Sequence, residues 1–206
     1  IFLVIAGLLW LLKWLFFVAI TLGIGRAVLI AALAVRSNAK ANRPMPPAID
    51  PDRFVSVIIP AFNEARVIEA SVNRVLASTE VKLEVIVVDD GSTDGTSDIV
   101  SKAFSADPRV RLLTLQNGGK AHALNQALKL ANGDIIVALD ADTQFEPETI
   151  ARLARWFADD RIGAVAGNAK VGNRINLATR WQAVEYVTAQ NLERRALDRF
   201  DAITVV

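Results

Sequence analysis

The sequence predicts an α/β domain with an open, mostly parallel sheet and helices on both faces, preceded by an N-terminal transmembrane helical segment. Short runs rich in β-branched residues alternate with helical patterns from Phe54 onward, as they do in strand–helix–strand units. The first 36 residues are almost entirely apolar. We therefore expect a transmembrane segment at residues 1–36, a linker at 37–53 and the α/β domain at 54–206.

The N-terminal segment is long enough to cross a lipid bilayer. One helix over residues 1–35 would measure about 50 Å, against a hydrocarbon core of about 30 Å. Two interpretations stay open: a single tilted span centred near Trp14–Val35, or two spans with a break near Lys13. A buried core helix is a third reading of the same composition. Because Arg26 is costly near the middle of a span, we expect it to face protein or to reach the interface.

Basic residues follow the span and orient it. Arg36, Lys40 and Arg43 lie directly after the apolar run. The positive-inside rule therefore places the α/β domain on the cytoplasmic face of an inner or plasma membrane. The stretch Ala39–Asp52 contains four prolines and no apolar periodicity, which is typical of a linker.

Composition excludes several classes of function. The chain has 206 residues, of which 52% are apolar, too many for a disordered protein. It has no cysteine and one histidine, which excludes disulfide scaffolds, thiol chemistry and His-rich metal sites. Beyond residue 36 the chain carries 20 basic and 22 acidic residues, a net charge of −2, so no nucleic-acid partner is expected.

The elements follow from the alternation of the two periods. Strands are predicted at Val55–Ile59, Leu83–Val88, Val110–Leu115, Asp134–Leu139 and Gly163–Ala166, with another starting at Ala202–Val206. Helices are predicted at Ala65–Ala77, Thr96–Phe104, Ala121–Ala131, Glu148–Phe157 and Leu177–Asp198.

Polar residues gather directly after the first two strands, where open α/β sheets bind ligands. We expect Pro60 to end the first strand, because it cannot donate to a ladder. Asn63 and Glu64 follow it, and either could cap the next helix. Asp89 and Asp90 end the second strand, where two adjacent carboxylates are costly unless they are hydrogen-bonded or charge-paired.

In the same stretch, Asp94 and Thr93 are candidate caps of the following helix.

The third and fourth strand ends carry a different chemistry. Gly118 and Gly119 permit a close approach of a ligand, and Lys120 stands at a helix start, where the dipole disfavours a cation. A lysine in that place indicates an anionic partner such as a diphosphate, although a plain turn with a solvated lysine fits this segment too. Asp140 and Asp142 place two oxygen donors near one point, as Mg²⁺ or Mn²⁺ requires.

At these four sites the sequence resembles the family 2 glycosyltransferases of the GT-A fold. The segments that carry the resemblance are Val57–Glu64, Val87–Asp94, Asn117–Lys120 and Leu139–Asp142. More narrowly, the sequence is similar to the membrane-embedded processive synthases of β-linked polysaccharides, which include cellulose, chitin, hyaluronan and poly-N-acetylglucosamine synthases. Residues 167–173 and the helix after them look most like the N-acetylglucosamine branch.

The resemblance implies a role for each candidate residue. Pro60, Asn63 and Glu64 would border the nucleotide of a UDP-sugar, and Asp90, with Asp89, would contact its uracil. Lys120 would lie near the diphosphate. Asp140 would contact the nucleotide-sugar or the metal's shell, and Asp142 would ligate Mg²⁺ or Mn²⁺. The best match for the donor is UDP-N-acetylglucosamine, transferred with inversion to a growing polysaccharide or a lipid-linked acceptor.

Some motifs of that family are absent from this sequence. The general base, an Asp in a Glu-Asp or Thr-Glu-Asp motif, is expected downstream of Val206, as is the acceptor-binding Gln-x-x-Arg-Trp motif. We therefore assign no catalytic base here and expect this chain to be inactive in transfer by itself. The alternatives are a non-processive transferase to a polyprenyl phosphate, a non-catalytic nucleotide-binding module, or a nucleotidyltransferase, whose basic Gly-rich loop after the first strand is not found here.

Overall fold

The computed structural model describes residues 2–38, 46, 48, 50, 53–167, 172, 175–187, 192–197 and 200. The chain divides into two compact units. One contains residues 45–163 and holds the sheet, and the other joins residues 1–44 with 164–206. The division differs from the sequence-based boundary at residue 54, which stays a prediction.

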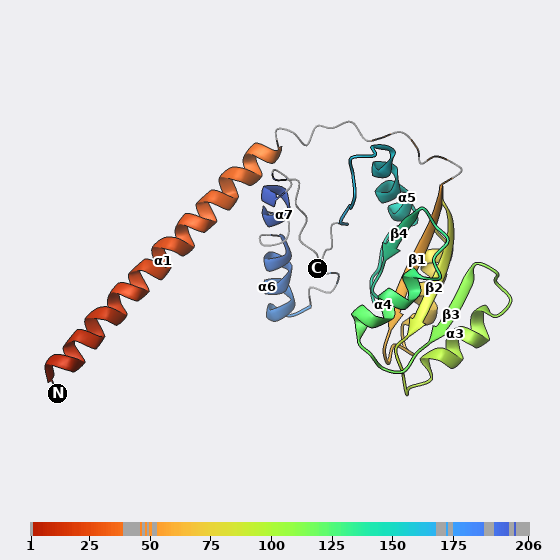
Figure 1. The fold of residues 1–206 in the computed structure, drawn as a ribbon, viewed down its shortest axis with the longest axis horizontal. Coiled ribbons are helices and arrows are strands. Elements are labelled where there is room, and N and C mark those ends of the chain that lie inside the picture. The colour runs from red at the N-terminus through yellow and green to blue at the C-terminus, as the bar shows by residue number, and fades with distance from the viewer. Residues whose placement is uncertain are drawn as a thin grey trace. The chain divides into compact units, whose positions relative to one another are not determined.

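The elements of the described residues alternate as expected (Figure 1). The strands are β1 (Phe54–Ala61), β2 (Lys82–Asp89), β3 (Val110–Thr114) and β4 (Ile135–Ala138). The helices are α1 (Phe2–Asn38), α2 (Ile68–Leu76), α3 (Thr96–Phe104), α4 (Lys120–Leu128), α5 (Thr149–Ala154), the 3₁₀-helix η1 (Arg155–Ala158), α6 (Leu177–Glu185) and α7 (Leu192–Leu197).

The four strands form one parallel sheet in the order β3-β2-β1-β4. The chain runs outward from β1 through β2 to β3, and α4 then returns it to β4 on the other side of β1. The strand order therefore reverses between β1 and β4. In open α/β sheets such a reversal leaves a crevice beyond the carboxyl ends of the strands, which is where ligands bind.

Both faces of the sheet are covered, which confirms the predicted fold class. On one face, Val57, Ile59 and Val85 pack in a core to which α2, α3 and α5 contribute. On the other face, Ile58, Ile86 and Val88 pack against Ala123 and Ala127 of α4. Because strands β1 and β2 are buried on both sides, they read in the sequence as nearly continuous apolar runs.

The first strand continues one residue beyond Pro60, contrary to the expectation that this proline ends it. Pro60 is paired in register with Val88 of β2. The Ile58 carbonyl accepts from Leu139 on the β4 side, and the Ala61 carbonyl accepts from Asp90 on the β2 side. Since successive residues of a strand point to alternate sides, the missing N–H of Pro60 faces β4. The β1–β4 ladder has already ended there, at Ile58 and Ala138.

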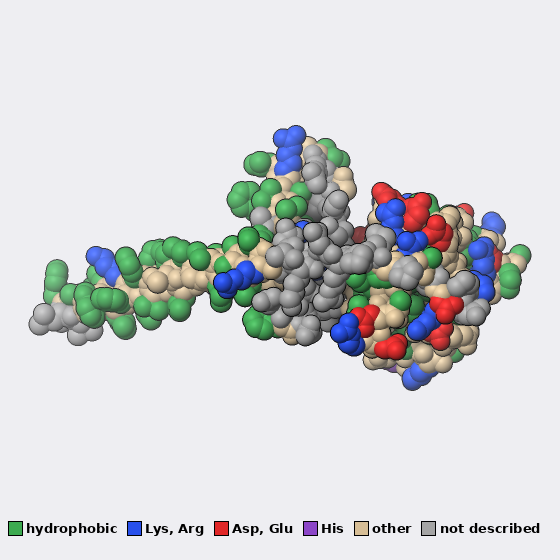
Figure 2. Space-filling view, turned by 90° about the horizontal axis from the view of Figure 1, so that it is seen from above, with side chains coloured by type: hydrophobic (Ala, Val, Ile, Leu, Met, Phe, Trp, Pro, Cys, Tyr) green, Lys and Arg blue, Asp and Glu red, His purple; other side chains and the backbone are tan. Residues whose placement is uncertain are grey.

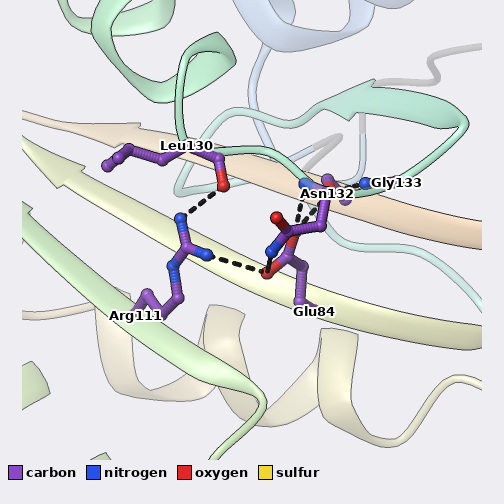
Figure 3. Close-up of polar contacts among 6 residues, drawn as sticks. Glu84, Arg111, Leu130, Asn132 and Gly133 are labelled. Carbon is purple, nitrogen blue, oxygen red and sulfur yellow. Dashed lines mark hydrogen bonds and ion pairs between the residues drawn. The ribbon is translucent and has the colours of Figure 1, made fainter.

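A buried polar network ties the amino ends of the strands to the segment before β4 (Figure 3). Glu84 of β2 is 6% exposed, and its carboxylate accepts from the Ser56 hydroxyl at 2.6 Å and the Asn132 amide at 2.8 Å. Arg111 of β3 lies 3.5 Å from the same carboxylate. The Gly133 amide donates to the Ser56 hydroxyl at 2.8 Å. This network fixes where the chain enters β4.

Two predicted elements differ in the structure. Residues 163–166 form no strand, since this segment has one β-branched residue beside glycine and alanine and so has low strand propensity. The helix predicted at 177–198 is present as α6 and α7, with residues 188–191 between them outside the described residues. The strand predicted at 202–206 also lies outside them. The predicted linker and residues 167–173 do so for the most part.

The other unit contains the apolar helix α1. This helix is continuous from Phe2 to Asn38, without the break near Lys13 that a two-span interpretation requires. Its stretch Ile5–Arg36 is long and apolar enough to cross a membrane, and its apolar side chains are largely exposed, unlike those of a buried core helix (Figure 2). The guanidinium of Arg26 lies 2.5 Å from the Glu193 carboxylate of α7, although the arginine side chain is 71% exposed, so the expected protein contact consists of this ion pair.

Candidate active site

A pocket of about 320 Å³ lies at the carboxyl ends of the strands, where the strand order reverses. Its walls come from the last two residues of β1, from the segments that follow β1, β2 and β4, and from the first residue of α4. The residues that line it are Pro60, Ala61, Phe62, Glu64, Asp90, Lys120, Asp140, Ala141 and Asp142. The structure therefore brings together six of the eight side chains that the sequence singles out.

Asp90 is the most buried of the charged side chains that line this pocket. Its side chain is 4% exposed, although it follows β2 directly. One carboxylate oxygen accepts from the Gly118 amide and the other from the Gly119 amide, both at 2.8 Å. These bonds provide the compensation that a buried carboxylate needs, and they come from main-chain donors rather than from a basic side chain.

Lys120 and Asp140 form an ion pair in the pocket. The lysine Nζ lies 2.5 Å from a carboxylate oxygen of Asp140, and both side chains are 59% exposed. An ion pair this exposed contributes little to stability, because water screens it. Both groups are therefore accessible to a ligand, the lysine as a cation for phosphate and the carboxylate as an oxygen donor.

Among the described residues that line the pocket, Lys120 is the one basic side chain beside four carboxylates. Burial raises the pKa of Glu64, and the negative charges of Asp142, Asp94 and Asp140 raise it further. Each added negative charge makes ionisation of the next one harder, so the cluster favours a bound cation. Within the described ranges no group of three or more metal-binding side chains converges. The donor set therefore fits a cation that takes one or two protein oxygens and completes its shell with phosphate and water.

Two of the predicted site residues do not line the pocket. Asp89 is 1% exposed, and its carboxylate accepts from the Ser92 amide at 2.8 Å and from the Ser97 hydroxyl. Asn63 has a positive φ of 57° and turns its side chain towards the loop after β2, where it accepts from the Thr93 amide at 2.9 Å. Both residues hold the loop between β2 and α3 in place.

The helix caps expected after β1 are not formed. Residue Val67 occupies the N-cap of α2 without a side-chain bond, so neither Asn63 nor Glu64 caps that helix. Gly95 is the N-cap residue of α3, but the Asp94 carboxylate before it accepts a hydrogen bond from the first amide of the helix, that of Thr96, at 3.1 Å. The same carboxylate accepts from the Ala65 amide at 3.0 Å. Thr93 does not cap.

Sequence reasoning missed the apolar part of the pocket. Ala61, Phe62 and Ala141 line it, and the Phe62 side chain is 51% exposed. Their position at the end of β1, directly after it or beside Asp140 is the only signal that could have identified them. The amides of Gly118 and Gly119 were not predicted as hydrogen-bond donors either, because a sequence carries no record of where its main-chain groups point.

Comparison with known proteins shows which family the chain is similar to. The model of the family described as "Glycosyl transferase family 2" matches residues 56–204. The chain is 29% identical over 159 residues to a poly-β-1,6-N-acetyl-D-glucosamine synthase of Staphylococcus aureus, covering 77% of this chain and 39% of that protein. It is 40% identical over 108 residues to a chondroitin synthase of Pasteurella multocida, covering 52% of this chain and 11% of that protein. The chain thus spans well under two thirds of either relative.

A solved structure shares the fold. A mannosyltransferase of Pyrobaculum calidifontis, in complex with GDP-Man and Mn²⁺, is 35% identical to the chain with a TM-score of 0.60. The match covers 70% of this chain and 44% of that one.

Proposed function

Because this chain belongs to glycosyl transferase family 2, we propose that its pocket binds the donor of a sugar transfer, a UDP-sugar held with a divalent cation. The observation that carries this proposal is the convergence of Asp90, Lys120, Asp140 and Asp142 in one pocket at the reversal of strand order. A lysine beside two accessible carboxylates is a set that can hold a diphosphate and its metal together.

In this proposal, Asp142 and Asp140 hold Mg²⁺ or Mn²⁺ through their carboxylate oxygens. When bound, such an ion neutralises the negative charge that develops on a departing diphosphate. Lys120 contacts the diphosphate from the start of α4. The bound Mn²⁺ of the Pyrobaculum mannosyltransferase supports a divalent cation for this fold.

The nucleoside end of the pocket is assigned to residues at the end of β1 and directly after β1 and β2. Asp90 keeps further lone pairs beyond those that Gly118 and Gly119 use, and with these it accepts an N–H of the uracil. Pro60 and Glu64 border the nucleotide. Asn63 and Asp89, which do not line the pocket, act through the loop that they hold.

We assign the sugar and the acceptor from the relatives. The synthase of S. aureus is named for poly-β-1,6-N-acetyl-D-glucosamine, and it aligns over most of the sheet-bearing unit and beyond. UDP-N-acetylglucosamine is therefore the proposed donor and a growing β-linked polysaccharide the proposed acceptor. The base that activates the acceptor is expected outside this chain, so the chain supplies the donor half of the reaction.

Calorimetric titration of UDP into the detergent-solubilised chain tests the donor assignment. We expect binding with Mn²⁺ that disappears when EDTA removes the metal, because the diphosphate and the carboxylates would then repel each other. GDP, titrated in parallel, should bind more weakly. Tighter binding of GDP would contradict UDP as the donor nucleotide and favour GDP. If a folded sample binds neither nucleotide, the pocket is not a donor site.

The membrane topology is a separate part of the proposal: α1 anchors the chain in the inner or plasma membrane, and the sheet-bearing unit lies in the cytoplasm. The chain has no cysteine, so single cysteines can report their side of the membrane. In intact cells, a membrane-impermeant maleimide should label a Phe2→Cys variant and not a Ser105→Cys variant, which becomes reactive after lysis. Labelling of Ser105→Cys in intact cells would reverse the assigned orientation.

A further inference from the structure

The carboxylate of Asp90 does more than line the pocket, because it grips the turn that precedes α4. Both of its oxygens are used: one accepts from Gly118 and the other from Gly119, at 2.8 Å each. A carboxylate is the only common side chain that offers two equivalent acceptors to two successive amides. Hydrogen bonds to an ionised acceptor are about twice as strong as neutral ones.

The same turn is packed closely against the end of β2. Gly91 has a φ of +80°, and a Cβ built on it would lie 2.8 Å from the Asn117 amide nitrogen. A Cβ on Gly118 would lie 2.8 Å from the His122 ring. The Leu115 amide donates to the Asp89 carbonyl at 2.8 Å just before the turn. Main-chain atoms on one side and the His122 ring on the other therefore leave the turn little room to move.

The position of this turn decides where Lys120 begins α4. Gly119 has a φ of +86°, a conformation that glycine adopts readily, and Lys120 is the next residue. From there the lysine Nζ lies 2.5 Å from the carboxylate of Asp140, which follows β4. A chain of contacts therefore links Asp90 to the lysine and then to the Asp140–Asp142 segment.

We propose that Asp90 is a positioning residue for Lys120: by holding the Gly118 and Gly119 amides, it keeps the lysine aimed at the diphosphate subsite. The proposal rests on the donor function above only for the identity of the ligand. It adds a role to the base contact assigned there, because the predicted effect falls on the phosphate end of the nucleotide rather than on the base.

The contact itself is tested without any ligand. Amide hydrogen exchange of the wild-type chain should show Gly118 and Gly119 exchanging slowly, although they lie in an exposed turn. In Asp90→Asn the side chain offers one acceptor instead of two, so at least one of these amides should exchange faster, while β1 and β2 keep their protection. Fast exchange of both amides in the wild-type chain would overturn the proposal.

The link to Lys120 is tested by comparing UMP with UDP in the presence of Mn²⁺. These nucleotides share the base and differ in the second phosphate. Asp90→Asn should weaken UDP by on the order of tenfold more than it weakens UMP. In a Lys120→Ala background, the same substitution should weaken both nucleotides equally, because no lysine is left to misplace.

Two further variants sharpen the outcome. Asp98→Asn removes the same charge from the exposed face of α3, and it should leave both affinities unchanged. Asp90→Glu keeps the charge but displaces its oxygens by one methylene, and it should reproduce the UDP-specific loss if Asp90→Asn fails to fold. Equal weakening of UMP and UDP by the Asp90 variants would overturn the positioning role. If the wild-type chain binds neither nucleotide, the donor function fails, and hydrogen exchange still decides whether the contact exists.

Discussion

At the residue scale, the pocket combines an excess of negative charge with one accessible lysine. Lys120 pairs with Asp140. Burial raises the pKa of Glu64, and the negative charge of Asp142 is the next largest cause of this rise. Within the part of the chain that the structure describes, Asp142 lines the pocket without an ion-paired lysine or arginine, so the proposed metal role centres on this carboxylate. A hard cation bound there would relieve the repulsion within the cluster.

Replacing Asp142 by alanine should abolish metal-dependent binding of UDP. The substitution removes an oxygen donor and leaves the strands of the sheet untouched, because Asp142 lies beyond the end of β4. Calorimetric titration with and without Mn²⁺ measures the effect. Asp160→Ala, which removes an exposed carboxylate away from the pocket, is the matched control. An Asp142→Ala protein whose affinity still rises with Mn²⁺ would remove Asp142 from the metal site.

A second residue-scale prediction concerns Gly118. A Cβ there would lie 2.9 Å from Cγ of His122, so Gly118→Ala must push the ring or the turn aside. Overpacking of this kind costs ~1 kcal/mol. Where the free protein relieves it by moving the turn, binding that needs the native turn must restore the strain, so UDP should bind about fivefold more weakly.

The additional substitution His122→Ala should restore binding, because it removes the ring that the new methyl meets. Gly163→Ala, with no atom within 4 Å of the added Cβ, should have no effect. Failure of His122→Ala to rescue the variant would show that the ring is not the obstacle.

At the element scale, the sheet is tied together at both ends by buried carboxylates. Asp90 works at the carboxyl ends of the strands, and Glu84 at their amino ends (Figure 3). Burial by itself raises the pKa of Glu84, but hydrogen bonds from Ser56 and Asn132, with the charge of Arg111, outweigh burial and hold that pKa below its usual value. The folded protein thus favours the ionised form of Glu84.

This pKa shift predicts a pH dependence of stability. A carboxyl whose pKa is lower in the folded state stabilises the fold above its unfolded pKa, here about 4.5, and loses that contribution as the pH falls through the folded value. Glu84→Gln should be less stable than the wild type at pH 7 by ~2 kcal/mol. The variant lacks the ionisable group. As the pH falls below 4.5, its stability should therefore decrease less than that of the wild type.

Urea unfolding at a series of pH values measures both effects. Glu69→Gln, on the exposed side of α2, serves as the control. Parallel stability curves for the wild type and Glu84→Gln below pH 4.5 would contradict the lowered pKa.

At the scale of the whole molecule, the candidate site belongs entirely to one of the two compact units. Every lining residue of the pocket lies between residues 45 and 163, and so do both cores of the sheet. The other unit contributes the apolar helix α1, whose Arg26 is paired with Glu193. An unpaired arginine within or near a bilayer costs free energy, and pairing with a carboxylate lowers that cost.

We therefore expect residues 45–163 to fold and to bind UDP without the rest of the chain. The unit buries its own apolar residues on both faces of the sheet, and a two-sided core is what an independent α/β domain needs. Cooperative thermal unfolding and titration of UDP with Mn²⁺ measure the two properties. A fragment that unfolds cooperatively but binds UDP much more weakly than the whole chain would show that residues outside 45–163 complete the site.

The sequence by itself determined the class of fold, the four strands that the structure describes in the sheet and most of the polar side chains that meet in the pocket at their ends. These depend on local periodicity and on residue type, which a linear pattern carries. Asp90, Asp140 and Asp142 were singled out because they follow predicted strands closely, and Lys120 because it begins a helix after two glycines. The sequence wrongly predicted a strand at 163–166 and the end of the first strand at Pro60. In both places, pairing with a neighbouring strand decides whether the chain forms a strand.

Only the tertiary structure decided which groups face one another. Asp90 meets amides that lie 28 and 29 residues away, Asn63 bonds to the loop after β2 instead of capping α2, and Lys120 reaches Asp140. These partners are set by strand order, by register and by the conformation of two glycine-containing turns. None of these has a local signal in the sequence, because each depends on the packing of segments that are distant along the chain.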